Sequence, residues 1–155
     1  MYIMVSRRPS LAKRFTLTPP AMETTRYEKA LIVGAGTGFS AALARLFSRE
    51  DMTVALASRN PEKLAALCAE TGARAFACDS VHPAQVRRLF SEMEGALGEP
   101  DVVVYNASAR VRGPLVELEP GEVQRALAVT AFGGFLVAQE AARRMLPRKR
   151  GAILF

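Results

Sequence analysis

Short apolar runs alternate with longer amphipathic stretches along most of this chain. The short runs are rich in small and β-branched residues, which is typical of strands buried in a parallel sheet. The longer stretches repeat their apolar residues about every 3.6 positions, as helices with one buried face do. The predicted strands are residues 30–34, 53–58, 73–78, 101–105 and 152–155. The predicted helices are residues 38–49, 60–71, 82–97 and 120–145.

This regular alternation predicts an α/β fold. Each helix returns the chain to a strand parallel to the previous one, through a right-handed crossover. We therefore expect a doubly wound parallel sheet of order 3-2-1-4-5, with a ligand crevice at the switch between the first and fourth strands. The sequence ends at Phe155, inside the fifth predicted strand, so we expect that strand to be truncated.

Composition and charge narrow the class of protein. The chain has 155 residues, 50% of them hydrophobic, which is enough for one domain with its own core. Its net charge is +6, but four positive charges fall in the acid-free first 21 residues, which leaves +2 for the rest. We therefore expect no nucleic-acid partner. We also expect no membrane span, because the longest apolar run, residues 126–138, is too short to cross a bilayer.

The two cysteines indicate the compartment. Cys68 and Cys78 stand in apolar contexts, without the paired spacing of a metal or redox motif. We therefore expect free thiols, no metal site and a cytoplasmic protein.

Residues 1–26 differ from the predicted domain, residues 27–155. They are basic, lack periodicity and contain Pro19-Pro20, so we expect a disordered tail. One explanation is an organelle transit peptide. The explanation that we favour is an upstream start codon, with Met22 as the natural initiator.

A glycine-rich turn directly follows the first predicted strand and opens the first helix. Free N–H groups and the positive end of the helix dipole converge at such a turn, which suits a phosphate. The GxGxxG pattern fails, because Phe39 stands where its third glycine would fall, but a longer turn of the form Gly34-xxx-Gly38-x-Ser40 fits. A turn kept small for packing alone is the alternative. The candidate cofactor-binding residues here are Gly34, Gly36, Thr37, Gly38, Phe39 and Ser40.

The end of the second predicted strand bears on the choice of nucleotide. A carboxylate there would accept hydrogen bonds from the ribose of NAD, but the chain has Ser58 and Arg59. A guanidinium pairs with a 2′-phosphate, so NADP(H) is favoured over NAD(H). A solvated loop charge is the alternative for Arg59.

Polar residues also follow the third and fourth predicted strands. Asp79 could accept a hydrogen bond from an adenine amino group, or could simply begin a turn. Asn106, Ala107 and Ser108 follow the fourth strand, where an amide could bridge strand ends and a small residue could let a ring approach. Purely structural roles are the alternative.

Together these four segments, in register, resemble the short-chain dehydrogenase/reductase family over about residues 28–155. The resemblance implies a Rossmann-type domain that binds NAD(P)(H) and an enzyme that interconverts an alcohol and a carbonyl. It implies no particular substrate. Family roles carry over to individual residues as follows: the pyrophosphate is held by Gly34, Gly38 and Ser40, the adenine by Asp79, and the strand edge beside the ribose by Asn106 and Ala107.

The chain also departs from the family pattern. Ser40 replaces the third turn glycine and adds a possible phosphate donor, and Thr130 replaces the usual active-site asparagine. The family's serine and Tyr-xxx-Lys pair follow the fifth strand, and no tyrosine of this chain has a lysine four residues on. We therefore assign no catalytic residue and expect the chain to be inactive alone. The alternatives are a non-catalytic cofactor-binding or interaction domain, and an inactive gene fragment.

The helix predicted over residues 120–146 has a wider apolar face than one sheet contact requires. A second copy of the chain would cover this face in a homo-oligomer, and burial beneath a further C-terminal segment is the competing explanation. A cluster of basic residues at the end of this helix is expected to be a solvated face. Its members are Arg143, Arg144, Arg148, Lys149 and Arg150.

Overall fold

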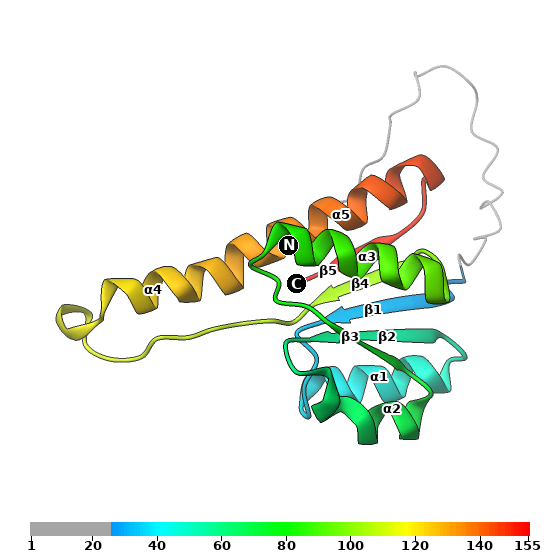
Figure 1. Cartoon of the computed structure of the whole chain (residues 1–155), viewed down its shortest axis with the longest axis horizontal. Helices are drawn as coiled ribbons and strands as arrows, with labels where there is room; N and C mark the ends of the chain where they lie inside the picture. The colour runs from blue at the N-terminus through cyan, green and yellow to red at the C-terminus, as the bar shows by residue number, and fades with distance from the viewer. Residues whose placement is uncertain (1–25) are drawn as a thin grey trace, which may run out of the picture.

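Five parallel strands form one sheet in the order β3-β2-β1-β4-β5, as predicted (Figure 1). The computed structural model describes residues 26–155, so the predicted tail, apart from Arg26, lies outside the described residues. The strands are β1 (Lys29–Val33), β2 (Thr53–Ser58), β3 (Arg74–Ala77), β4 (Val102–Tyr105) and β5 (Ala152–Leu154). All carboxyl ends of the strands meet at one edge, and the order reverses between β1 and β4 there.

Helices cover both faces of the sheet. On one face lie α1 (Phe39–Arg49) and α2 (Ala65–Thr71), and on the other lie α3 (Pro83–Leu97) and α5 (Gly133–Arg148) (Figure 1). A 3₁₀ turn, Pro61–Leu64, precedes α2, where the sequence predicted a helix beginning at residue 60.

The long helix predicted over residues 120–145 is interrupted. Its parts are α4 (Pro120–Leu127), a π-turn (Ala128–Phe132) and α5, and they follow one another along a single rod. α4 and the chain that leads to it project beyond the sheet as an arm (Figure 1). The π-turn adds a residue to one helical turn and so rotates α4 relative to α5.

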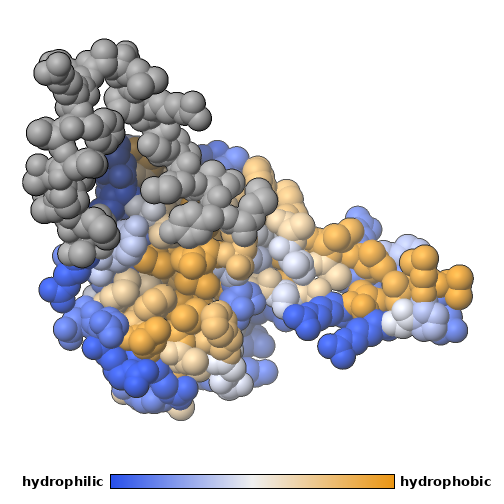
Figure 2. Space-filling view, turned by 180° about the vertical axis from the view of Figure 1, so that it is seen from behind, coloured by the Kyte–Doolittle hydropathy of each residue, from blue (hydrophilic) through white to orange (hydrophobic). Residues whose placement is uncertain are grey.

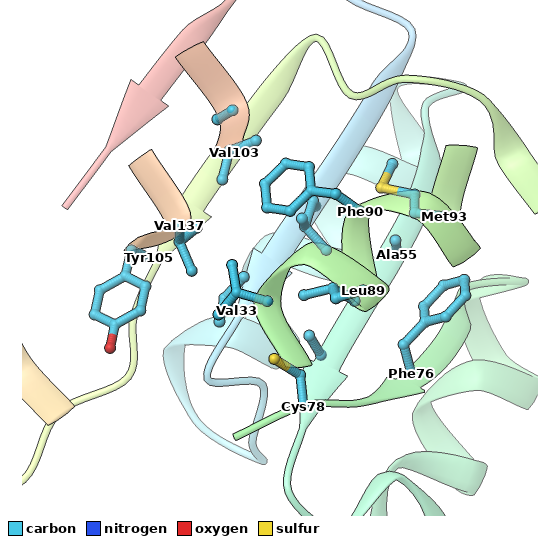
Figure 3. Close-up of a cluster of buried hydrophobic side chains, with 14 of the residues drawn as sticks. Val33, Ala55, Phe76, Cys78, Leu89, Phe90, Met93, Val103, Tyr105 and Val137 are labelled. Atoms are coloured by element: carbon cyan, nitrogen blue, oxygen red, sulfur yellow. The ribbon is translucent and has the colours of Figure 1, made fainter. Parts of the chain in front are cut away.

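Side-chain size decides how each helix packs on the sheet. Large side chains fill the face under α3 and α5, where Phe90 and Val137 lie over Val33 and Val103 (Figure 3). α1 instead presents its small residues to the sheet, while its large apolar residues Phe39 and Leu46 are 63% and 43% exposed. Small residues let α1 lie close to β1, which brings the glycine turn close to the strand ends.

A buried ionic cluster closes the amino edge of the sheet, opposite the crevice. The Asp101 carboxylate accepts a hydrogen bond from the Glu28 N–H at 2.9 Å and from Arg148 at 3.2 Å. Arg144 is only 17% exposed, bonds Glu140 at 2.8 Å and lies over the Phe90 ring. The expectation of a solvated basic face is therefore wrong for Arg144, because carboxylates of neighbouring elements neutralise it.

The two cysteines are free, with Cys78 buried and Cys68 partly buried. Burial raises the pKa of the Cys78 thiol to about 11, so this thiol is protonated at neutral pH. In the part of the chain that the structure describes, no helix is long and apolar enough to cross a membrane. Among the same residues, no group of three or more His, Cys, Asp or Glu side chains is placed to hold a metal ion.

Candidate functional site

The glycine turn is tied to the sheet at its first residue. The N–H groups of Gly34 and Ala35 both donate to the Ala57 carbonyl, at 3.0 and 2.9 Å. Gly34 has φ +83°, and a Cβ atom on it would lie 2.5 Å from the Cα atom of Ala107. Only glycine fits there, for both reasons. Gly34 therefore serves the close packing of β1 against the end of β4.

The rest of the turn is open. A Cβ atom on Gly36 or Gly38 would meet no protein atom within 4 Å. Within residues 26–155, the backbone N–H groups from Gly36 to Ser40 donate no hydrogen bond. No side chain caps α1, and its first turn contains no acid. Several N–H groups without a partner among the described residues therefore lie at the positive end of an eleven-residue helix, beside two glycines with open space next to them. This is an anion-binding arrangement.

Ser40 links the turn to β4. It is 1% exposed, and its hydroxyl donates to the Gly34 carbonyl at 3.2 Å and accepts from the Asn106 amide at 2.8 Å. The Asn106 N–H donates to the Val33 carbonyl at 2.8 Å. In this geometry the Ser40 hydroxyl joins the turn to β4, and its role as a phosphate donor stays a prediction.

Arg59 lies one strand away from the turn, at the carboxyl end of β2. It is exposed, and no carboxylate of the described residues pairs with it. Ser58 is partly buried and accepts a hydrogen bond from the Asn60 N–H at 3.3 Å. The Arg59 guanidinium is therefore accessible at the carboxyl edge of the sheet.

Asp79 follows β3 and closes a turn. Its carboxylate accepts from the Val81 N–H at 3.3 Å and lies 3.8 Å from the His82 ring. The backbone N–H of Asp79 donates a hydrogen bond to the Gln85 side-chain oxygen at 2.9 Å. These contacts fit the turn-forming alternative, and the carboxylate is still partly exposed.

Thr130 reaches the loop after β4. Its hydroxyl accepts from the Ala109 N–H at 3.1 Å and lies 3.2 Å from the Ala109 carbonyl, to which it donates. Ala107 underlies the glycine turn, and Ser108 is exposed beside it. The π-turn that carries Thr130 and the loop that borders the crevice are therefore fastened together.

The sequence reasoning missed a second contact to this π-turn. The Tyr105 hydroxyl, buried at the end of β4, bonds the Val129 carbonyl and the Ser80 hydroxyl. Burial raises the pKa of Tyr105, and the hydrogen bond from Ser80 only partly offsets this rise. The phenol is thus protonated at neutral pH. The one signal in the sequence was a tyrosine at the end of an otherwise all-valine strand.

A parallel sheet of this order, with an open glycine turn between the first strand and the first helix, is typical of α/β proteins that bind nucleotides. The family described as short chain dehydrogenase matches residues 28–155. The chain therefore belongs to the short-chain dehydrogenase family.

Relatives agree with this assignment. A D-threitol dehydrogenase of Mycolicibacterium smegmatis is 32% identical over 130 residues, which cover 81% of this chain and 50% of that protein. A sorbitol dehydrogenase of Cereibacter sphaeroides is 34% identical over 124 residues, which cover 79% of this chain and 48% of that protein. The chain thus spans about half the length of these curated relatives.

A solved structure matches both sequence and fold. A gluconate 5-dehydrogenase from Burkholderia cenocepacia, in complex with NADP and tartrate, superposes with a TM-score of 0.75 at 34% identity. The match covers 81% of this chain and 51% of that chain.

Proposed function

We propose that this chain is the cofactor-binding part of an NADP(H)-dependent oxidoreductase that interconverts an alcohol and a carbonyl by hydride transfer. The observation that carries the proposal is the set of unpaired backbone N–H groups from Gly36 to Ser40, facing open space at the start of α1. Family membership and dehydrogenase relatives support the reaction class.

The residues present fit a nicotinamide dinucleotide. The N–H groups of Gly36, Thr37, Gly38 and Phe39 would hold its pyrophosphate, and Asp79 would border the adenine. Asn106, Ala107 and Ser108 would form the wall beside the ribose. When bound, the cofactor supplies or accepts the hydride. The chain's own part is to hold the cofactor in one orientation, since Gly34 and Ser40 fix the turn against β4.

Arg59 is the basis for NADP(H) over NAD(H). An exposed guanidinium without a carboxylate partner among the described residues can form two charge-assisted hydrogen bonds to a 2′-phosphate. The NADP held by the structurally similar gluconate 5-dehydrogenase is consistent with this choice.

The test is a titration of the 155-residue chain with NADPH and with NADH. Arg59→Ala should weaken NADPH binding by about 10- to 100-fold, the worth of charge-assisted hydrogen bonds, and leave NADH binding unchanged. Arg49→Ala is the matched control, because Arg49 lies at the far end of α1 from the turn. Equal binding of the two cofactors by the unmodified chain would refute the preference, and no binding of either would refute the site.

We also propose that this polypeptide binds cofactor without turnover. None of its tyrosines, Tyr2, Tyr27 and Tyr105, has a lysine four residues on, and the one at the crevice edge is a buried hydrogen-bonded phenol. The free thiols of Cys68 and Cys78 support a reducing compartment such as the cytoplasm as the location.

A second copy of the chain is the proposed partner of the long rod. Leu127, Phe132 and Phe135 are 61%, 47% and 55% exposed along it, and the two phenylalanine rings stack. Apolar residues gather on the rod and the arm (Figure 2). Burial of this stripe against the same stripe of a second copy would form a homo-oligomer.

A further inference from the structure

The π-turn between α4 and α5 is an unusual piece of backbone beside the crevice. A π-turn is rare in proteins and occurs mostly as a single turn inside an α-helix, often at a functional site. Here the Tyr105 hydroxyl of β4 bonds the Val129 carbonyl of the turn. Thr130 of the turn bonds the Ala109 backbone. Ser80, after β3, bonds the Tyr105 hydroxyl in turn.

The Tyr105 hydroxyl takes part in two hydrogen bonds. Its single proton is directed at the Val129 carbonyl, so the Ser80 hydroxyl must donate in the 3.0 Å contact between the two side chains. Tyr105 is 5% exposed and Ser80 is 6% exposed, so neither hydroxyl can exchange this partner for bulk water. The pair is therefore a fixed link between the sheet and the long rod.

The first residue of α5 is built around this link. A Cβ atom on Gly133 would contact the Tyr105 hydroxyl and lie 2.8 Å from the Ser80 hydroxyl oxygen. Gly133 has an ordinary helical φ of −60°, so space rather than backbone conformation requires glycine there. The rod thus lies close to β4 because Gly133 has no side chain where the Tyr105 hydroxyl stands.

The same link leads to the nucleotide crevice. Asn106 and Ala107, which directly follow Tyr105, bond Ser40 and underlie Gly34. Two residues further on, Ala109 is fastened to Thr130 of the π-turn. The segment Asn106–Ala109 is therefore held at both ends. Its first residue follows the strand that carries Tyr105, and its last residue bonds the π-turn that Tyr105 also bonds.

We propose that Tyr105, with Ser80, is a positioning residue that fixes the π-turn against β4 and so holds the Asn106–Ala109 wall ready for the cofactor. This inference rests on the proposed function for its effect on cofactor binding. The contact itself concerns only this chain and can be tested without cofactor.

The test uses Tyr105→Phe, which keeps the ring in the core and removes both hydrogen bonds. Amide hydrogen exchange at residues 109 and 128–133 should speed up, and NADPH affinity should fall about three- to tenfold, the size of effect expected for lost neutral hydrogen bonds. Tyr27→Phe is the matched control, because Tyr27 lies at the amino edge of the sheet, against Arg150. It should change neither measurement.

A second pair of variants keeps the inference falsifiable if Tyr105→Phe is less stable. Gly133→Ala alone should lower the free energy of unfolding. The double variant with Tyr105→Phe should lose less free energy than the sum of the two single losses, because the hydroxyl that the new methyl group would meet is absent. Additive effects would contradict the packing of Gly133 on this hydroxyl.

The outcomes separate the inference from the proposed function. Failure of the unmodified chain to bind NADPH would refute the proposed function, and hydrogen exchange would then decide the Tyr105 link alone. Unchanged exchange at residues 109 and 128–133 in Tyr105→Phe would overturn the inference. Faster exchange with unchanged NADPH affinity would also overturn it, because Tyr105 would then be structural without positioning the site.

Discussion

At the scale of single residues, the glycines of one turn differ in why a glycine stands at each position. Gly34 is required by the protein itself, because its φ is positive and Ala107 fills the space of a side chain. Gly36 and Gly38 have open space around them. Packing within the described residues does not require glycine at these two positions, and the proposed phosphate site does, so the difference can be measured.

Gly34→Ala should lower the free energy of unfolding by about 2–4 kcal/mol. Left-handed backbone strain accounts for about 1–2 kcal/mol and overpacking against Ala107 for about 1–3 kcal/mol. Urea denaturation of the two proteins measures the difference. A loss below about 0.5 kcal/mol, the range of ordinary surface substitutions, would contradict the packing described here.

Gly36→Ala should show the opposite pattern. Stability should stay within about 0.5 kcal/mol, because the new methyl group meets no protein atom. NADPH affinity should fall about tenfold or more, because the methyl group occupies the space where the pyrophosphate would approach the backbone. Isothermal titration alongside urea denaturation checks both parts, and loss of stability without loss of affinity would contradict the assignment.

Sequence reasoning reached the turn and Arg59 because their signals are local. A glycine spacing after a strand and the residue type at a strand end need no knowledge of distant parts of the chain. Tyr105, Ser80 and Gly133 were not predicted as a unit, because they come from three elements and meet only in the folded chain. Ser40 was predicted at the site, but its buried hydrogen bonds depend on Asn106, far along the sequence.

At the scale of elements, the positions of strands and helices follow from hydrophobic patterning, and the strand order follows from the rules for right-handed crossovers in doubly wound sheets. The π-turn does not, because residues 126–138 are apolar apart from Thr130 and the glycines, so no helical period marks the position of the extra residue. The neutralised Arg144 was also missed, since its carboxylate partners include Glu94 on another helix. Patterning thus predicts elements well, and predicts contacts between them poorly.

Asp101 ties several elements together at the amino edge, and its titration should appear in acid stability. Burial by itself raises the pKa of Asp101, but the Glu28 N–H, the Arg150 charge, the Lys29 N–H and Arg148 together lower it below 3.8. A carboxyl group whose pKa is lower in the folded than in the unfolded chain stabilises the fold at pH values above its unfolded-state pKa. This stabilisation is lost as the pH falls below about 3.8.

Asp101→Asn should therefore cost about 1.5–3 kcal/mol at pH 7, the range for hydrogen bonds to a charged group, because Arg148 keeps Glu99 as a partner and Arg150 is partly exposed. It should also flatten the fall in stability below pH 4. Urea denaturation from pH 7 to pH 3 measures both effects. Asp51→Asn is the control, because Asp51 is exposed, and an acid profile of Asp101→Asn parallel to that of the unmodified chain would contradict the assignment.

At the scale of the whole molecule, six of the ten exposed large hydrophobic side chains of the described residues lie on the long rod and its arm. Phe135→Glu, with or without Phe132→Glu, should shift the chain from oligomer to monomer in sedimentation experiments. Leu46→Glu places the same charge on α1, on the opposite face of the sheet, and should leave the oligomeric state unchanged. A monomeric unmodified chain would refute the proposed interface.

The unpaired N–H groups from Gly36 to Ser40 are the proposed phosphate site for the cofactor. The most direct measurement is a ¹H–¹⁵N NMR titration of the 155-residue chain with NADPH, which follows every backbone amide separately. We expect saturable shifts that are largest at residues 36–40, with further shifts at Arg59 and residues 106–109. Saturation with shifts elsewhere and none at residues 36–40, or no shifts at all, would contradict this proposal.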